Sequence, residues 1–178
     1  MHTEEKIKSE IKYEGYVVKV TFDTVKLEDG SIATRDVVRH KGGACVAPLT
    51  DEGELIFVKQ YRYVLGKELL ELPAGKLDSI DEDPYLCAKR ELKEETGCTA
   101  DEIKFMGNFI ATPGFCDENI RLYMAKGLRY GENNLDEGEF LDVIKIPLKD
   151  AKEMVLSGEI IDGKTQALIL KICAELKI

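Results

Sequence analysis

Apolar and polar residues alternate in short runs over the first forty residues of the chain. The runs cover residues 16–22, 23–27 and 34–38, and a turn at residues 28–31 separates the second run from the third. An alternation with a period of two is typical of strands that bury one face. The pattern predicts a small antiparallel sheet within residues 1–40.

A second group of strands follows. Residues 43–49 are largely apolar, residues 50–53 favour a tight turn, and residues 54–62 return as another apolar run. Two apolar runs joined by a short polar turn indicate a β-hairpin. Another short strand is predicted at residues 69–72, and the Pro-Ala-Gly sequence of residues 73–75 ends it.

The clearest helix lies between Asp83 and Gly97. Asp83 suits the N-cap, Pro84 suits the first helical position, and Gly97 suits the residue just past the end. The helix carries an apolar stripe at helical spacing, formed by Tyr85, Ala88 and Leu92.

The remainder of the chain predicts more strands and then two helices. The strands are expected at residues 103–111, 120–125 and 140–146, and the helices at residues 148–157 and 164–177. The order of strands, helix, strands and helices indicates a mixed β-sheet flanked by helices, an α+β fold, rather than a regular parallel repeat.

Composition narrows the class of protein. The chain has 178 residues, 44% of them hydrophobic, which suits one compact domain with a real core. A formal net charge of −9 argues against non-specific nucleic-acid binding, and no apolar run is long enough to cross a membrane. The charged N-terminal residues do not resemble a signal peptide. Five widely spaced cysteines and two histidines indicate reduced thiols without a zinc site, so we expect a cytoplasmic protein.

Three glutamates of the predicted helix share one face. Glu91, Glu94 and Glu95 stand at positions i, i+3 and i+4, so their like charges repel by a few tenths of a kcal/mol per pair. A divalent cation would remove this repulsion, because hard cations take carboxylate oxygens as ligands. The alternative is a solvated acidic face, since glutamate is also a good helix former.

The residues around these glutamates resemble the Nudix hydrolase family. Its motif is a glycine, five residues, a glutamate, seven residues, and then Arg-Glu-apolar-x-Glu-Glu-x-Gly-apolar. The chain departs from the motif once, because six residues rather than five separate Gly75 from the first glutamate. We interpret the sixth as an extra loop residue. From that glutamate onward eight positions match, namely Glu82, Arg90, Glu91, Leu92, Glu94, Glu95, Gly97 and Cys98.

The resemblance implies a fold and a metal site. The fold would be an α/β/α sandwich with a Nudix-like mixed sheet and the small N-terminal antiparallel sheet. Glu91 and Glu95 would be the principal ligands of Mg²⁺, with Mn²⁺ as a possible substitute. Glu94 would be a third ligand with a catalytic role, and the Ala74 carbonyl would be a backbone ligand. Arg90 would orient the carboxylates during catalysis.

Four further stretches make the chain most similar to the ADP-ribose pyrophosphatase branch of that family. They are residues 35–43, 58–62, 71–75 and 112–118, and residues 158–165 also resemble the branch. Pro113 lies sixteen residues after Gly97, where that branch carries a proline that marks the substrate class. The resemblance implies that five residues bind substrate: Arg35, Arg62, Gly75, Pro113 and Glu118.

The catalytic base is expected in the acidic loop after residue 130. By resemblance the candidates are Glu137 and Glu139, and Glu137 is favoured because of its offset from the strand that follows. The resemblance also implies a homodimer in which the N-terminal strands are exchanged. Residues 1–40 would then serve the partner's site, and residues 41–178 would form the hydrolase domain.

Three functions fit these observations. The first is hydrolysis of ADP-ribose, a nucleoside diphosphate sugar, to AMP and ribose 5-phosphate. The second is hydrolysis of another nucleotide sugar, such as GDP-mannose, or of a broad range of them. The third is a catalytically silent nucleotide-binding regulator. The complete set of glutamates speaks against the third function, because a pure binder need not keep repelling carboxylates.

Overall fold

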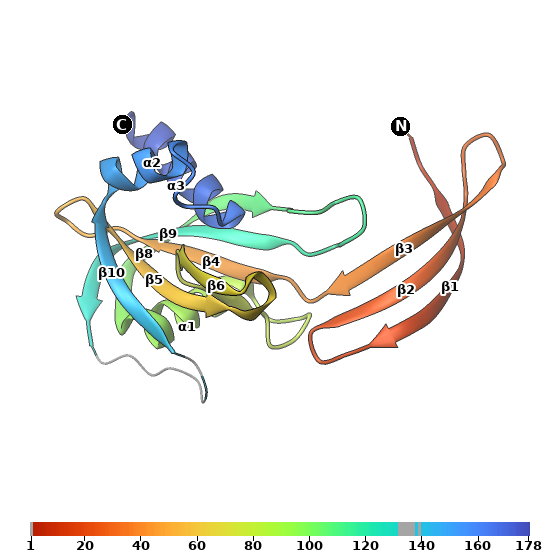
Figure 1. Cartoon of the computed structure of the whole chain (residues 1–178), viewed down its shortest axis with the longest axis horizontal. Coiled ribbons are helices and arrows are strands. Elements are labelled where there is room, and N and C mark those ends of the chain that lie inside the picture. Colours follow the sequence, from red (N-terminus) through yellow and green to blue (C-terminus); the bar gives the residue numbers. More distant parts are fainter. Residues whose placement is uncertain (1, 132–137, 139) are drawn as a thin grey trace. The chain divides into compact units, whose positions relative to one another are not determined.

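The computed structural model describes residues 2–131, 138 and 140–178. The chain forms two compact units, which Figure 1 traces along the sequence. One unit contains Met1–Gly42 and Ile110–Asn119, and the other contains Gly43–Phe109 and Ile120–Ile178. The predicted division into residues 1–40, exchanged between subunits, and residues 41–178, the hydrolase domain, stays a prediction.

The first unit is built on an antiparallel sheet of three strands. The strands are β1 (Glu5–Glu14), β2 (Val18–Lys26) and β3 (Ile32–His40), with β2 in the middle. The sequence pattern predicted β2 and β3 but missed β1. Ile7 and Ile11 of β1 are more than half exposed, so pairing with β2 rather than burial of one face holds this strand in place.

The loop of residues 110–119 belongs to this first unit although it follows β8 in the sequence. The backbone N–H of Val38 donates to the carbonyl of Phe115 at 2.7 Å, and the N–H of Asp117 donates to the carbonyl of Val38 at 3.1 Å. The Asp117 carboxylate also accepts from the N–H of His40 at 2.8 Å. The end of β3 therefore fixes this loop.

The second unit contains two sheets. One is mixed, because β4 and β9 are parallel and the other pairs are antiparallel; its order is β7-β4-β9-β8. The other sheet is antiparallel with the order β10-β5-β6. The strands are β4 (Gly43–Pro48), β5 (Glu54–Arg62), β6 (Lys67–Glu71), β7 (Ala74–Lys76), β8 (Cys98–Phe109), β9 (Ile120–Tyr130) and β10 (Leu141–Pro147), and η1 (Tyr63–Leu65) joins β5 to β6.

The three helices begin and end close to their predicted positions. They are α1 (Pro84–Thr96), α2 (Leu148–Leu156) and α3 (Gly163–Leu176). The Asp83 carboxylate caps α1 by accepting from the N–H of Tyr85 at 2.9 Å, and Gly97 ends it with a φ of 71°. Only glycine adopts this left-handed conformation without a steric cost.

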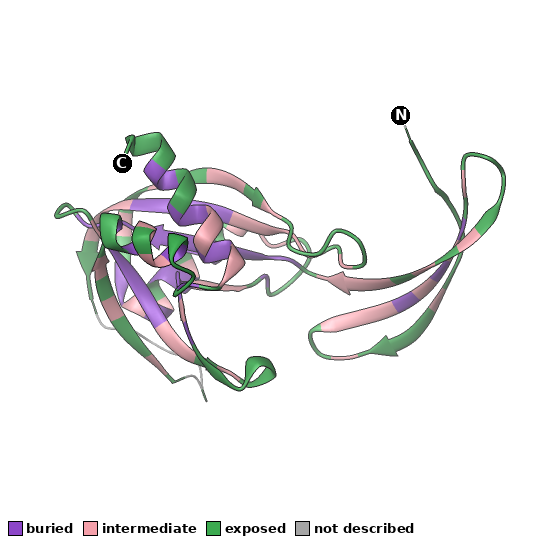
Figure 2. Ribbon diagram, turned by 45° about the horizontal axis from the view of Figure 1, so that its top comes forward, coloured by how far each residue is buried: buried purple, intermediate pink, exposed green. Residues whose placement is uncertain are grey.

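The second unit has a core on each side of its sheets. Along the fully buried strand β4, Cys45 and Ala47 pack with residues of α2 and α3, whereas Ala44 and Val46 pack with residues of α1. Figure 2 shows the buried residues concentrated in these central strands. Strand side chains alternate between faces, so a strand covered on both sides must be apolar throughout. The predicted α/β/α sandwich is confirmed.

None of the helices in the described residues is long and apolar enough to span a membrane. All five cysteines are free thiols, and only Cys116 is not buried. Burial, reinforced by the charge of Glu91, raises the pKa of the Cys87 thiol to about 12. This thiol therefore stays protonated at pH 8, and a protonated thiol is a poor nucleophile.

We accordingly expect one fast thiol in the native protein. Titration with an aromatic disulfide reagent at pH 8 should modify Cys116 rapidly and the four buried cysteines only after unfolding in denaturant. The Cys116→Ser variant is the control and should lose the fast phase. Rapid modification of two or more thiols in the native protein would contradict the burial of the others.

Candidate active site

The glutamates of α1 lie on the side of the helix that faces β7. Glu91 and Glu95 are buried, with 9% and 3% of their surfaces exposed, and Glu94 is half-buried. Cys87, Ala88 and Leu92 of the same helix enter the core and so fix its rotation. Two carboxylates are thereby held away from bulk water. A charge in such a buried position must be compensated by hydrogen bonds, ion pairs or a cation.

Strand β7 approaches α1 very closely at Ala74 and Gly75. The backbone N–H of Ala74 donates to the Glu95 carboxylate at 3.0 Å. A Cβ atom placed on Gly75 would lie 1.8 Å from Oε1 of Glu91, far inside van der Waals contact. The absence of a side chain at position 75 therefore allows the strand and the buried carboxylate to share this space.

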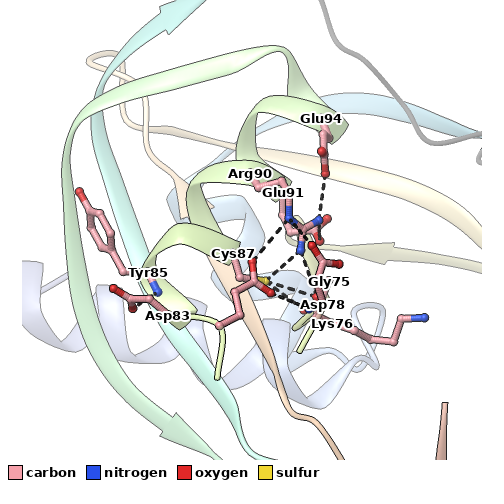
Figure 3. A network of polar contacts seen from close by, with 10 residues as sticks. Gly75, Lys76, Asp78, Asp83, Tyr85, Cys87, Arg90, Glu91 and Glu94 are labelled. Atoms are coloured by element: carbon pink, nitrogen blue, oxygen red, sulfur yellow. Dashed lines mark hydrogen bonds and ion pairs between the residues drawn. The ribbon is translucent and has the colours of Figure 1, made fainter. Parts of the chain in front are cut away.

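Arg90 connects the glutamates to the last residue of β7 (Figure 3). Its Nη1 donates to Glu91 at 2.7 Å and to Glu94 at 3.1 Å, and its Nη2 donates to the carbonyl of Lys76 at 3.1 Å. Burial alone would lower the pKa of Arg90, but the charge of Glu91 and other neighbouring groups raises it further above its usual range. The guanidinium thus stays charged and compensates the acidic face.

The loop with the extra residue keeps Glu82 near the helix. Oε2 of Glu82 accepts from the backbone N–H of Asp78 at 2.6 Å, and Oε1 of Glu82 lies 3.7 Å from Nε of Arg90. The interpretation that residues 76–81 contain one extra residue stays a prediction.

The donors present suit a hard divalent cation. Two buried carboxylates, Glu91 and Glu95, lie beside the backbone of Ala74 and Gly75, and magnesium typically binds one or two protein carboxylates and completes its shell with other oxygens. Across the described residues, no three side chains of His, Cys, Asp or Glu are grouped as a metal site. Arg90 pairs with Glu91 and Glu94 in this arrangement.

A second charged cluster lies next to this site, and most of its residues had no role predicted from the sequence. Both carboxylate oxygens of Glu71 accept from Arg62, at 2.6 and 2.8 Å, and Nζ of Lys164 lies 2.5 Å from Oε2 of Glu71. Burial would raise the pKa of Glu71, but the Arg62 hydrogen bonds and the Lys164 charge lower it overall. The available signal was a charged residue inside an apolar strand, Leu69-Leu70-Glu71-Leu72.

Three predicted substrate residues belong to the first unit. Arg35 of β3 pairs with Glu4 through its Nη2 at 2.5 Å and its Nε at 3.1 Å. Pro113 is exposed in the loop of residues 110–119, and Oε1 of Glu118 lies 3.3 Å from Nδ1 of His40. Arg35 and Glu118 thus have charged neighbours within the first unit, and Pro113 is exposed. The roles of all three toward a substrate stay predictions.

Both candidates for the catalytic base, Glu137 and Glu139, lie outside the described residues. The roles predicted for Arg62, Gly75, Ala74 and the helix glutamates also remain predictions. What the structure adds is proximity: it brings Ala74, Gly75, Arg90 and the glutamates of α1 together.

Comparison with known proteins connects this geometry to named relatives. A methanol dehydrogenase activator of Bacillus methanolicus is 43% identical over 91% of this chain and 88% of its own length. An ADP-ribose pyrophosphatase of Bacillus subtilis is 40% identical with the same coverage of both chains. More distant relatives include a GDP-mannose pyrophosphatase of Escherichia coli K12, 30% identical over 92% of this chain and 91% of its own length.

The fold also matches a solved structure. A crystal structure of an ADP compounds hydrolase superposes with a TM-score of 0.85 and covers 98% of this chain and 95% of that chain. Its 19% sequence identity makes this a comparison of folds alone. The NUDIX domain model matches residues 39–164, a range that contains the whole of α1 and β7. Pyrophosphatases of this family generally use divalent metal ions. With the family model, the relatives and the fold in agreement, the chain belongs to the Nudix family and is a Nudix hydrolase.

Proposed function

We propose that the protein hydrolyses the pyrophosphate of ADP-ribose to AMP and ribose 5-phosphate with the help of Mg²⁺. The observation that carries this proposal is the pair of buried carboxylates, Glu91 and Glu95, held against the Ala74–Gly75 backbone. The 40% identity to an ADP-ribose pyrophosphatase supports the choice of substrate. Mn²⁺ is the expected substitute ion.

The residues of the chain divide the chemistry between them. Glu91 and Glu95 would hold the ion with the Ala74 carbonyl, and Glu94 would assist. A bound divalent ion neutralises phosphate oxygens and makes a water molecule more acidic. Arg90 orients the carboxylates, as its hydrogen bonds to Glu91 and Glu94 support.

Water adds to one phosphorus, the bridging P–O bond breaks, and one proton leaves the water. Glu137 accepts that proton, with Glu139 as the alternative base. These two roles rest on the resemblance of the sequence.

The proposed substrate residues are those that the sequence resemblance implies. Arg62 would contact phosphate or ribose, Arg35 would contact the nucleotide end, and Gly75, Pro113 and Glu118 would also bind substrate. We further propose a cytoplasmic homodimer in which residues 1–40 serve the partner's site. Support comes from apolar side chains of the first unit that are more than half exposed, namely Ile7, Ile11, Tyr13, Tyr16 and Ile32.

A second candidate function comes from the name of one relative. The identity of 43% to a methanol dehydrogenase activator favours an effect on an alcohol dehydrogenase. This candidate does not exclude hydrolysis, because both could depend on the same glutamates. The test measures methanol oxidation by such a dehydrogenase with the wild-type chain and with its Glu95→Gln variant. Activation that survives the substitution is independent of hydrolysis, and activation lost with it depends on the same site.

A panel of nucleotide sugars tests the proposed function. The purified chain is incubated with Mg²⁺ and ADP-ribose, another ADP-sugar or GDP-mannose, and the products are separated by chromatography. We expect ADP-ribose to give AMP and ribose 5-phosphate with a kcat/KM at least tenfold above that for GDP-mannose, about 1.4 kcal/mol in transition-state binding. A preference for GDP-mannose would overturn ADP-ribose as the substrate. If no member of the panel were cleaved, both hydrolase functions would be rejected and the catalytically silent regulator would be the remaining hypothesis.

A further inference from the structure

The first turn of α3 contacts the segment that leads from β6 to β7. Thr165 is completely buried, and its Oγ1 accepts from the backbone N–H of Leu72 at 2.9 Å. The preceding residue, Lys164, places its Nζ 2.5 Å from Glu71 and 3.0 Å from Asp162. Two consecutive residues of α3 therefore hold two consecutive residues of the segment.

The two charges at the centre of this contact are buried, and the charges of the whole contact balance. Glu71 is 1% exposed and Lys164 is 9% exposed. Arg62 and Lys164 supply two positive charges, and Glu71 and Asp162 supply two negative charges. Burying charges is costly, and an apolar cluster of the same volume often stabilises a fold equally well. The charged cluster instead fixes the geometry closely, because each carboxylate oxygen of Glu71 has a directed partner.

Hydrogen bonds along residues 71–74 connect this contact with the candidate metal site. After Glu71 and Leu72, the carbonyl of Pro73 accepts from the N–H of Val46 at 2.9 Å. The next residue, Ala74, donates its N–H to the buried carboxylate of Glu95 at 3.0 Å. Every residue from 71 to 74 thus has a directed hydrogen bond, and the last of these bonds ends on a predicted metal ligand.

We propose that Thr165 and Lys164 are positioning residues that set the Glu71–Ala74 segment and, through it, the Glu95 carboxylate for divalent-metal binding. This assignment rests on the proposed function, since it concerns the same metal site. Neither residue is among the predicted metal ligands or substrate residues. The cluster acts by fixing the backbone N–H that orients Glu95, in the way that the hydrogen-bond partners of metal ligands tune affinity in other proteins.

Removal of one hydroxyl group tests the assignment. Thr165→Val keeps the shape of the side chain but leaves the Leu72 N–H without its acceptor. The matched control is Thr50→Val, because Thr50 is also buried and its Oγ1 accepts a backbone N–H, that of Glu54 at 3.2 Å, in the β4–β5 turn. Thr165→Ser retains the hydroxyl and serves as the rescue variant, and Lys164→Met tests the charge.

The readout is Mn²⁺ binding, followed by the electron paramagnetic resonance signal of the free ion, together with hydrogen exchange of the peptide that contains residues 72–75. We expect Thr165→Val to weaken Mn²⁺ binding about tenfold, to speed exchange of that peptide and to lower kcat more than it raises KM. Lys164→Met should act in the same direction. Thr165→Ser and Thr50→Val should bind Mn²⁺ like the wild type.

The outcomes separate this assignment from the function on which it rests. Wild-type Mn²⁺ affinity in Thr165→Val, or an equal loss in Thr50→Val, would overturn the positioning role and leave the proposed hydrolysis intact. A wild-type chain that binds Mn²⁺ but cleaves no nucleotide sugar would overturn the function alone. If the wild type bound no Mn²⁺, both would fall. Loss of folding in Thr165→Val is checked by circular dichroism, and Thr165→Ser and Lys164→Met then decide the matter.

Discussion

The Glu95→Gln variant is expected to lose turnover by roughly 10³-fold, which corresponds to about 4 kcal/mol of transition-state stabilisation. The carboxylate of Glu95 is buried and accepts from the N–H of Ala74. Glutamine has the same shape, and its carbonyl oxygen can keep that hydrogen bond, so the fold should survive. The charge that would hold the metal is lost. Steady-state kinetics with ADP-ribose and Mg²⁺ measures the effect.

Thermal unfolding with and without metal separates catalysis from folding in this variant. Without metal, Glu95→Gln should melt at or slightly above the wild-type temperature, since one like-charge pair on α1 disappears. Ligand that binds only the folded state stabilises it by about 2.7 kcal/mol at a hundredfold excess over Kd. The wild type should show this upward shift with Mn²⁺, and the variant should not. Exposed Glu153→Gln on α2 is the control. Near-normal turnover in Glu95→Gln would show that the metal is held elsewhere.

Gly75→Ala is expected to reduce turnover at least a hundredfold and to destabilise the fold by about 1–3 kcal/mol, the usual cost of forcing extra volume into a packed site. The new methyl group would lie 1.8 Å from Oε1 and 2.1 Å from Cδ of Glu91, so the carboxylate or the strand must move. Chemical denaturation and kinetics measure the two effects. Gly53→Ala is a useful comparison, because its Cβ would meet no atom within 4 Å and only its φ of +80° opposes the change.

A double-mutant cycle identifies the cause of the Gly75 effect. If the clash with Glu91 is responsible, Gly75→Ala should cost clearly less stability in a Glu91→Ala background than in the wild type. Additive costs would locate the strain in the backbone instead.

Local signals made the centre of this site predictable. Asp83, Pro84 and Gly97 set the ends of α1 through hydrogen bonds and φ angles that involve near neighbours only. With the ends fixed, the spacing of Glu91, Glu94 and Glu95 placed them on one face. The proximity of β7 was not predictable in the same way, since Ala74 and Glu95 lie far apart in the sequence and β7 has only three residues.

The features missed from the sequence depend on distant partners. Strand β1 has exposed isoleucines and many charges, so it lacks a buried face that alternation could reveal. The ion pair of Glu71 with Lys164 joins residues 93 positions apart, and a charged residue in an apolar strand does not name its partner. Residue pattern predicts which side chains are exceptional, whereas the tertiary fold decides what they contact.

The discontinuity of the first unit limits how this protein can be divided. Its sheet comes from the beginning of the chain, but the loop of residues 110–119 that pairs with β3 comes from the middle of it. In a shortened protein starting at Gly43, that loop, which carries Pro113, would lose its backbone hydrogen bonds to Val38. Proteolysis or genetic fusion near residue 42 would therefore also deprive the loop of residues 110–119 of its hydrogen-bond partners in β3.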